Sequence, residues 1–390
     1  MTAVCIASSL GAGLEPTLSA LQSGATGLAP CRFETVDLAT YAGEIPGLDD
    51  WRLDNTLARF DCRNNRLARL ALAQDGFEAA VEAAKARYGP GRIGVFLGTS
   101  TSGILQTEQA YRRRDGQGRL PPDFDYAGTQ STFSVADFVM AVLGISGPAL
   151  VVSSACASTT KVFATAARMI ETGMCDAAIV GGADSLCLTT LYGFNSLQLL
   201  APGPCRPFDA ARGGLSIGEA AGFALLERPD EAPVGAVRLL GVGESSDAHH
   251  MSAPEPHGTG ATLSMSRALA AARLRPEQID YINLHGTATR IGDAAEDHAI
   301  VSLFGDATPC SSTKGHTGHT LGASGIVEAI IAALSIKDGL IPGSPHTEMR
   351  DPLLRCCYVT TARSARIDRV LSNSFGFGGS NASLIIGRAG

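Results

Sequence analysis

One cysteine and two histidines occupy positions where a side chain could do chemistry. Cys156 lies in SSACAS (153–158), after an apolar, β-rich run and before a run with helical periodicity. At the start of a helix, backbone N–H groups and the helix dipole favour the thiolate, which is the nucleophilic form of cysteine. Free cysteines are also common as apolar core residues, so the position alone leaves both interpretations open.

Two motifs in the second half of the chain supply partners for such a thiol. His285 begins HGTAT (285–289) at the end of a predicted strand, and His319 follows Lys314 in STKGHTGHTLGASG (312–325). Functional residues concentrate in loops at the ends of elements, which favours a catalytic role over a purely structural one. The other histidines lack such settings and are interpreted as structural: His249, His250, His257, His298, His316 and His346.

A glycine-rich turn, NSFGFGGSN (373–381), is the fourth candidate. Its glycines permit close approach of the backbone and unusual dihedral angles. Phe375 and Phe377 within this turn are either apolar core residues or a movable cover over an apolar pocket.

Alternating strand-like and helix-like runs position these motifs and indicate an α/β fold. The first unit is predicted to be a buried parallel strand, a helix and a second buried strand, at 149–155, 156–173 and 176–184. The second half is predicted to contain a strand, a helix and the two strands of a hairpin, at 279–284, 321–339, 369–374 and 381–387. A stretch with prolines and charges places the boundary between two halves of similar style, 1–235 and 236–390.

Composition excludes several classes of function. The 390 residues carry a formal net charge of −7, which argues against nonspecific binding to nucleic acid and against a membrane-surface role. No apolar stretch is long enough to span a bilayer, and the first residues lack the basic region of a signal peptide. The ten cysteines include no C-x-x-C pair, so we interpret the thiols as reduced and the protein as cytoplasmic.

Six stretches in one order resemble the elongating β-ketoacyl-acyl-carrier-protein synthases of the thiolase superfamily, across essentially the whole chain. They are SSACAS, CRPFDAARGGLSIGEAAG (205–222), SSDAHHMSAP (245–254), HGTATRIGDAAE (285–296), SSTKGHTGHTLGASGIVEA (311–329) and NSFGFGGSN. The resemblance implies a thiolase-like fold, in which two similar α/β halves stack as a five-layered αβαβα arrangement with the site between them. It also implies a homodimer, or a heterodimer with a related ketosynthase.

The resemblance assigns a role to each candidate. Cys156 would take an acyl chain from an acyl carrier protein as a thioester, and His285 and His319 would promote decarboxylation of malonyl-carrier protein and stabilise the enolate. The enolate would then attack the thioester in a Claisen condensation that yields a β-ketoacyl product. Lys314 and Glu328 would hold and tune the histidines. No metal and no cofactor is expected, because acyl groups arrive on the phosphopantetheine of the carrier protein.

Further positions match the family's substrate contacts. The backbone N–H groups of Cys156 and Phe377 would form the oxyanion hole, and Phe377 would also act as a gate. Thr287 and Thr289 match residues that hydrogen-bond the pantetheine arm. Arg290 is a departure from the family pattern, because related synthases commonly have a proline near this position.

Docking of an acidic carrier protein to an acidic enzyme requires a local basic patch. In LARFDCRNNRLARLAL (57–72), Arg59, Arg63 and Arg66 have the spacing i, i+4, i+7 of a single helical face. The resemblance adds that Arg59 matches a docking position of the family. A rival cluster comprises Arg112, Arg113 and Arg114, and an ordinary solvated face is the alternative to both.

Related activities fit less well. A biosynthetic thiolase would carry a second cysteine where Ser374, Phe375 and Gly376 stand, and an initiating synthase would have asparagine in place of His319. A non-catalytic chain-length factor keeps the fold but loses the nucleophile, so the intact Cys156 disfavours this alternative. Acyl transfer or thioester hydrolysis alone would not need both histidines. The stretches CRNNRL and GTSTSG look more like synthases of specialised pathways, such as aryl polyene biosynthesis, so fatty acid and polyketide pathways both stay open.

Overall fold

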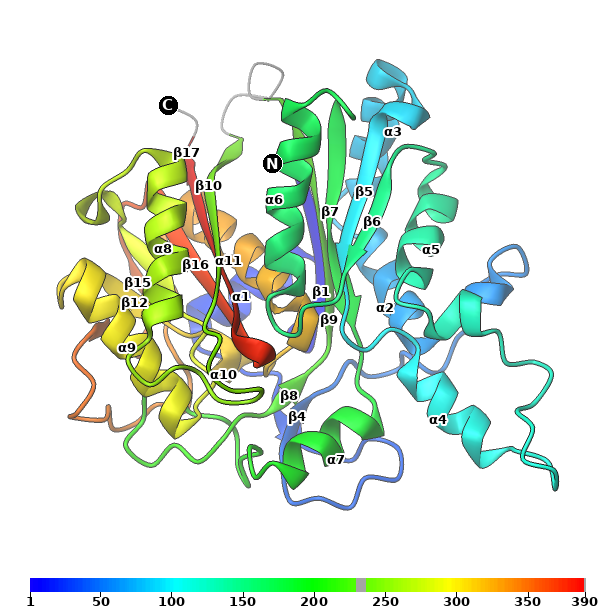
Figure 1. Ribbon diagram of the computed structural model, residues 1–390, viewed down its shortest axis with the longest axis horizontal. Helices are drawn as coiled ribbons and strands as arrows, with labels where there is room; N and C mark the ends of the chain where they lie inside the picture. Colours follow the sequence, from blue (N-terminus) through cyan, green and yellow to red (C-terminus); the bar gives the residue numbers. More distant parts are fainter. Residues whose placement is uncertain (229–235, 389–390) are drawn as a thin grey trace.

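Two six-stranded sheets form the framework of the computed structural model, which describes residues 1–228 and 236–388 (Figure 1). The first sheet has the strand order β2-β1-β9-β7-β5-β6, and the second has the order β10-β17-β16-β11-β12-β14. The strands of the first sheet are β1 (Ala3–Ser8), β2 (Gly11–Ala12), β5 (Ile93–Gly98), β6 (Ala149–Val152), β7 (Ala177–Asp184) and β9 (Ala220–Glu227). Those of the second are β10 (Val237–Ser246), β11 (Tyr281–Asn283), β12 (Pro309–Ser311), β14 (Cys357–Tyr358), β16 (Arg369–Gly376) and β17 (Ser380–Arg388). The boundary expected near residue 235 lies outside the described residues.

Helices form three layers around and between these sheets (Figure 1). Between the sheets lie α6 (Ser158–Glu171), which contacts β5, β7 and β10, and α11 (Ser324–Asp338), which contacts β9 and β16. The outer face of the first sheet is covered by α2 (Arg63–Leu72), α3 (Phe77–Tyr88) and α5 (Ser134–Leu143). The outer face of the second is covered by α8 (Thr259–Ala272) and α9 (Arg290–Phe304). This order of layers confirms the predicted αβαβα architecture.

Shorter elements complete the fold. The helices among them are α1 (Leu14–Ser23), α4 (Ile104–Arg112), α7 (Leu188–Ser196) and α10 (Lys314–Thr317). The strands are β3 (Ala29–Pro30), β4 (Tyr41–Gly43), β8 (Ile217–Gly218), β13 (Leu340–Ile341) and β15 (Arg363–Ser364). An arm formed by α4 and the residues that follow it projects from the body of the molecule (Figure 1).

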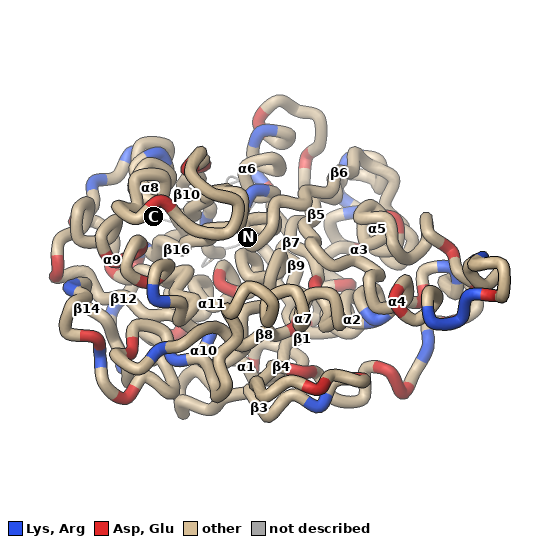
Figure 2. Tube along the Cα trace, turned by 60° about the horizontal axis from the view of Figure 1, so that its bottom comes forward, with Lys and Arg blue, Asp and Glu red and all other residues tan. Residues whose placement is uncertain are grey.

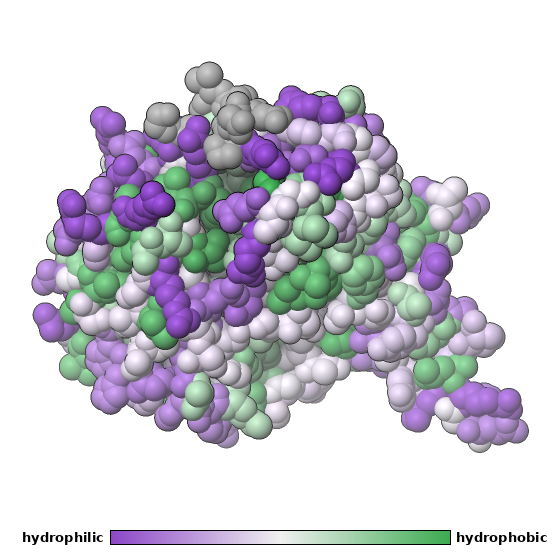
Figure 3. Space-filling model, turned by 45° about the horizontal axis from the view of Figure 1, so that its top comes forward, coloured by the Kyte–Doolittle hydropathy of each residue, from purple (hydrophilic) through white to green (hydrophobic). Residues whose placement is uncertain are grey.

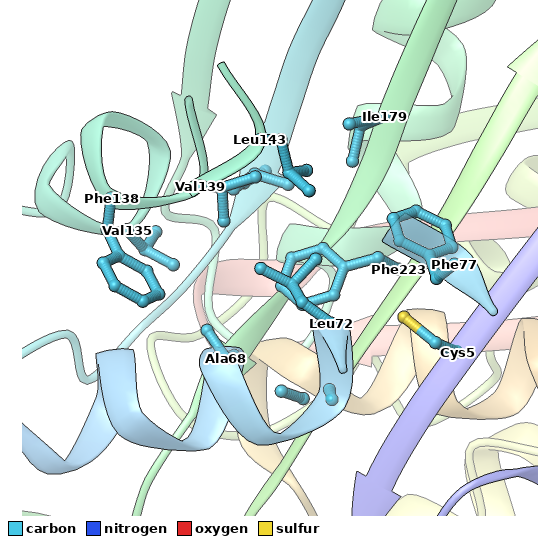
Figure 4. Packing of buried hydrophobic residues seen from close by; sticks show 14 of the residues in the cluster. Cys5, Ala68, Leu72, Phe77, Val135, Phe138, Val139, Leu143, Ile179 and Phe223 are labelled. Carbon is cyan, nitrogen blue, oxygen red and sulfur yellow. The ribbon is translucent and has the colours of Figure 1, made fainter. Parts of the chain in front are cut away.

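An apolar core fixes the outer helices of the first half on their sheet (Figure 4). Phe223 on β9 and Phe77 on α3 have ring centroids 6.3 Å apart, and Leu72 on α2 is buried in the same cluster. Fully burying a side chain of this kind contributes about 1.5–3 kcal/mol. Apolar side chains such as Leu72 therefore hold the C-terminal part of α2 on the sheet.

The central helix α11 is buried on all sides. Every residue from 324 to 336 is buried, because the helix packs between two sheets instead of facing solvent on one side. Such a helix is expected to be apolar all round. Glu328, the one acidic residue in this stretch, is therefore a charge placed at the centre of the molecule.

The elements around Cys156 follow the expectation with one exception. β7 is buried along its whole length, and α6 ends at Glu171, two residues before Gly173 with its φ of 72°. β6 is parallel to β5 as predicted, but it is the last strand of its sheet and Leu150 is 41% exposed. The expectation of a buried strand is therefore wrong, because strand order depends on residues elsewhere in the chain.

The second half agrees with the predicted elements. β16 and β17 form an antiparallel hairpin around the glycine-rich turn, and β11 and α11 lie within the predicted ranges. Among the described residues, no helix is both long enough and apolar enough to cross a membrane. On the face shown in Figure 3, apolar residues form separate groups between hydrophilic side chains.

Candidate active site

A strained turn presents the sulfur of Cys156. β6 ends at Val152, and Ala155 adopts a left-handed conformation with a φ of 46°, which is costly for a residue with a side chain. The hydroxyl of Ser158 accepts a hydrogen bond from the Ser154 N–H at 2.9 Å and donates to the Ala155 carbonyl at 2.6 Å. These bonds hold the turn, and α6 begins two residues after the cysteine.

His319 lies directly beside this sulfur. Its Nε2 is 3.0 Å from Cys156 Sγ, and its Nδ1 is 3.0 Å from the hydroxyl of Ser324. Its backbone N–H donates to the carbonyl of Ser216 at 2.7 Å, which ties the loop to the chain just before β8. The ring is therefore held at both nitrogens and at the backbone.

His285 forms the other side of the site. It follows β11, and Glu296 on α9 accepts the backbone N–H groups of His285 and Gly286 at 2.8 and 2.7 Å. The rings of His285 and His319 have centroids 5.3 Å apart and an interplanar angle of 84°. One side-chain atom from each of Cys156, His285 and His319 lies within 4.8 Å of the other two. The structure thus brings the three predicted residues together.

Lys314 and Glu328 form a buried ion pair behind His285. Lys314 Nζ is 2.5 Å from Glu328 Oε1, 2.5 Å from the carbonyl of His285 and 3.4 Å from His285 Nδ1. Burial raises the pKa of Glu328 to about 7, and Lys314 opposes this shift. The pair therefore fixes the His285 ring from the side opposite the cavity. This position agrees with the holding role expected for Lys314 and Glu328.

Burial determines the protonation states of the site. It lowers the pKa values of His285 and His319 well below their ordinary range, and the charge of Lys314 acts in the same direction. Both imidazoles are consequently neutral at neutral pH. Burial also raises the pKa of Cys156 to about 11, which outweighs the lowering by Lys314 and by backbone N–H groups. The resting cysteine is a thiol, although its place before a helix favours the thiolate.

The glycine-rich turn reaches the sulfur from the opposite half. The backbone N–H groups of Phe377 and of Cys156 itself act on the Cys156 sulfur and favour its charged form. A Cβ on Gly376 would lie only 3.2 Å from Cys156 N and 3.2 Å from the carbonyl of Ser154. Glycine therefore permits the close approach that brings two backbone donors to one point.

A cavity of about 510 Å³ opens above these residues. Thr287 and Thr289 line it with their hydroxyls 3.0 Å apart, and Arg290 and Ile291 also contribute to its wall. Phe377 stacks on Phe194 of α7, with ring centroids 5.4 Å apart and an interplanar angle of 26°. The cavity joins the predicted pantetheine contacts to the predicted nucleophile.

Two of the three arginines predicted for docking are buried. Arg63 and Arg66 are 1% and 3% exposed, and Arg59 precedes α2 instead of sharing its face. Arg63 pairs with Glu219 at 2.6 Å and with Asp49; Arg66 pairs with Asp49 at 2.7 Å and with Asp61 at 2.9 Å. The predicted basic face is therefore wrong, because acidic residues pair with two of its members inside the protein. The Arg59 side chain is 59% exposed.

Loss of the Arg63 charge should destabilise the fold. We expect Arg63→Ala to lower the free energy of unfolding by about 3–5 kcal/mol, because Glu219 would remain buried without its partner. Arg59→Ala, the matched control on the surface, should change it by less than about 0.5 kcal/mol. Urea denaturation of the two variants measures the difference, and equal midpoints would contradict the buried ion pair.

Three supporting residues were not predicted. Glu296 holds the backbone of His285, Ser324 contacts His319, and Asp184 at the end of β7 accepts the Gly322 N–H at 2.6 Å and the Thr99 hydroxyl at 2.7 Å. Asp184 could have been noticed as an acidic residue that ends a buried apolar strand. Glu296 and Ser324 lie near their partners in sequence, but each has the composition of an ordinary helical residue, so no local signal marks it.

Two family models cover most of the chain. The N-terminal domain of beta-ketoacyl synthase matches residues 2–232, and the C-terminal domain matches residues 236–348. A mitochondrial 3-oxoacyl-[acyl-carrier-protein] synthase of Arabidopsis thaliana is 40% identical over 261 residues, which span 62% of this chain and 57% of that protein. 3-Oxoacyl-[acyl-carrier-protein] synthase 2 of Staphylococcus aureus is 35% identical over 316 residues, which span 75% of this chain and 76% of that protein.

Solved structures resemble the whole chain. The ketosynthase ApeO in complex with its chain length factor ApeC, from Xenorhabdus doucetiae, has a TM-score of 0.90 and 37% identity, covering 100% of this chain and 97% of the other. The ishigamide ketosynthase/chain length factor has a TM-score of 0.89 and 29% identity, covering 100% and 98%.

Proposed function

This chain belongs to the β-ketoacyl synthase family, and we propose that Cys156, His285 and His319 perform its decarboxylative Claisen condensation. One observation carries the assignment: two neutral imidazoles converge on one thiol at the bottom of a cavity. A buried cysteine with only a structural role would not need both. The enzyme is thus a condensing acyltransferase that joins an acyl chain to a malonyl unit.

Loading of the acyl chain begins at the Cys156 thiol. The sulfur attacks the thioester carbonyl of an acyl-carrier protein, and its proton passes to His319 Nε2, 3.0 Å away. That proton then goes to the departing pantetheine thiol, which leaves an acyl-cysteine and a neutral imidazole. The Ser324 hydroxyl at Nδ1 can donate or accept, so it suits His319 with or without the transferred proton.

Decarboxylation follows at the two imidazoles. The malonyl carboxylate leaves as carbon dioxide, and its electron pair becomes an enolate whose negative oxygen needs hydrogen-bond donors. Lys314 lies beside His285 Nδ1, so this nitrogen accepts and Nε2–H is left to donate toward the cavity. His319 supplies the second donor in its other neutral tautomer, with the proton on Nε2 and with Nδ1 accepting from the Ser324 hydroxyl. Neutral imidazoles in a buried site stabilise this charge without solvent reorganisation.

Condensation joins the two substrates at Cys156. The enolate carbon attacks the acyl-cysteine carbonyl. The resulting oxyanion accepts hydrogen bonds from the backbone N–H groups of Cys156 and Phe377. Collapse expels the Cys156 sulfur as a thiolate and yields the β-ketoacyl product on the carrier protein. The thiolate then takes up one proton from solvent, which restores the resting thiol. Atoms and charges balance without a separate cofactor, in agreement with acyl groups delivered on phosphopantetheine.

The partners follow from the same proposal. An acyl carrier protein delivers the substrates, and its pantetheine arm enters the cavity past Thr287 and Thr289. The two solved ketosynthases with chain length factors favour a heterodimer with a related subunit over a homodimer. We place the reaction in a fatty acid or specialised polyene or polyketide pathway, in the cytoplasm. The alternative, a non-catalytic subunit like a chain length factor, would leave Cys156 unacylated.

Mass spectrometry of Cys156 tests the proposal. The purified protein is incubated with acyl-carrier proteins of different chain length and saturation, and the mass of the Cys156 peptide is measured. We expect acylation by a subset of the panel, which would define the substrate and the pathway. Absence of acylation throughout the panel, alone and with a candidate partner subunit, would favour the non-catalytic alternative.

Phe377 is expected to act as a gate. Its ring stacks on Phe194 in the cavity wall, and Gly378 with its φ of 78° gives the turn freedom to move. Phe194→Ala removes the stacking partner, so we expect faster acyl loading with reduced discrimination between chain lengths, by roughly two- to ten-fold. Crystal structures with and without an acyl group on Cys156 provide the second measurement. An identical Phe377 rotamer in both would identify a fixed core residue instead.

Carrier-protein docking is expected to involve the exposed arginines. Figure 2 shows consecutive basic positions at the end of α4 and directly after it, where Arg112, Arg113 and Arg114 lie. Arg59 is the exposed member of the other predicted cluster. Arg59→Glu should raise the KM for acyl-carrier protein by roughly two- to ten-fold and reduce its salt dependence. Turnover of small acyl-pantetheine substrates should not change. Arg113→Glu is the matched comparison, and an effect in this variant alone would move the docking site to the arm.

A further inference from the structure

The three atoms that perform the proposed reaction are also arranged as ligands for a metal ion. Cys156 Sγ and one ring nitrogen each of His285 and His319 lie within 4.8 Å of one another, and the sulfur is 3.0 Å from His319 Nε2. In tetrahedral zinc sites, Zn–S and Zn–N distances near 2.3 and 2.0–2.1 Å place ligand atoms about 3.3–3.6 Å apart. Small side-chain rotations would therefore bring all three to bonding distance.

We infer that Cys156, His285 and His319 bind Zn²⁺ reversibly and that this binding inhibits the enzyme in its unacylated state. The inference rests on the proposed function, because the same sulfur must accept the acyl chain. It concerns a regulatory or inhibitory ion, and it adds no metal to the catalytic steps.

The chemistry of the ligands selects the ion. One thiolate and two imidazoles suit Zn²⁺, whereas Mg²⁺ and Ca²⁺ prefer oxygen ligands. The cavity above the site leaves a fourth position open for water, as in three-ligand zinc sites. Binding replaces the thiol proton with the metal, so one proton is released to solvent for each ion bound and no redox change occurs.

The surroundings of the ligands support both binding and reversibility. Ser324 holds the second nitrogen of His319, which is the usual arrangement behind a metal-bound histidine. Lys314 acts against binding. A metal at His285 Nε2 would leave the ring proton on Nδ1, and this N–H would face the Lys314 ammonium, whose Nζ lies 3.4 Å away. The Glu328 carboxylate, 2.5 Å from Lys314, offsets part of this charge. We therefore expect a reversible site, weaker than a structural zinc site.

The acyl chain and the metal must exclude one another. An acylated sulfur is a neutral thioester and a poor ligand for zinc. Loading of the acyl chain should thus release the ion, and bound ion should protect Cys156 from alkylation. Zinc would then inhibit the unacylated enzyme and would not inhibit the enzyme that carries an acyl chain on Cys156.

Equilibrium dialysis of the unacylated protein against Zn²⁺ tests the inference without any substrate. We expect one ion per chain, removable by a chelator, with binding weakened at least about ten-fold in Cys156→Ala and in His319→Ala. Cys62→Ala, which removes another buried cysteine, should bind as the unmodified protein does. Unmodified protein alkylated at Cys156 repeats the test without a folding risk, and Mg²⁺ should not compete.

The possible failures are distinguishable. Unchanged zinc binding in Cys156→Ala and in the alkylated protein, or no binding by the unmodified protein, would overturn the inference. Condensation is measured separately in the presence of chelator. Full condensation without any zinc binding would leave the proposed function intact. Zinc binding without condensation would overturn the proposed function and the inhibition that rests on it, and would leave the zinc site itself.

Discussion

Cys156→Ala is expected to abolish condensation, with a loss of at least about 10³-fold in kcat, while the protein keeps its fold. The sulfur is the atom to which the acyl chain is joined, and no second thiol of the described residues lies among the cavity-lining side chains. The change removes one small buried atom, so it should affect folding little. A condensation assay with labelled malonyl-carrier protein measures the activity, and circular dichroism during heating measures the fold.

Two further variants make this result interpretable. Cys62→Ala removes a buried cysteine at the start of α2, and we expect normal condensation. Cys156→Gln places an amide where the acylated sulfur would lie, so decarboxylation of malonyl-carrier protein should continue without condensation. Full condensation by a folded Cys156→Ala protein would exclude the covalent mechanism.

Replacement of either histidine should block decarboxylation more strongly than acyl loading. Each imidazole supplies one hydrogen bond to the enolate, and loss of one preorganised donor typically lowers kcat by about 10²–10³-fold. His285→Ala should leave loading of Cys156 nearly intact, because the His285 ring contacts Lys314 through Nδ1, whereas the thiol contacts His319. His319→Ala should also slow loading to a smaller degree, because Nε2 is 3.0 Å from the thiol.

Separate assays of the half-reactions measure these effects. Labelled acyl-carrier protein reports the loading of Cys156, and labelled malonyl-carrier protein reports release of carbon dioxide. His257→Ala is the control, since this exposed histidine lies outside the cavity wall. A variant that lost loading but kept decarboxylation would show that the role assigned to its histidine is wrong.

Local patterns in the sequence predicted most elements around the site. The helical period after Cys156 predicted α6, the apolar run before Asp184 predicted β7, and the glycine-rich turn between two strands predicted the β16–β17 hairpin. Each of these depends on side chains that are neighbours in sequence. The sequence motifs identified Cys156 and His319 as candidates, and the structure brings these two residues into contact.

Properties that depend on distant residues could not be read in this way. Arg63 and Arg66 have a regular spacing, but Arg63 is buried against Glu219, which is 156 residues away, and Arg66 is buried beside Asp49, which is 17 residues away. The order of the strands likewise placed β6 at the edge of its sheet. Nothing in a stretch of ten residues records which other segment packs against it.

The chemical state of the site is the clearest case. The sequence by itself determined which residues are present: a cysteine before a helix, two histidines at element ends, and a lysine. Only the tertiary structure decided that His285 and His319 are neutral and that the pKa of Cys156 is raised to about 11. Their protonation depends on the loss of water around them and on the distance to Lys314, and both arise only when segments from the two halves pack into one buried site.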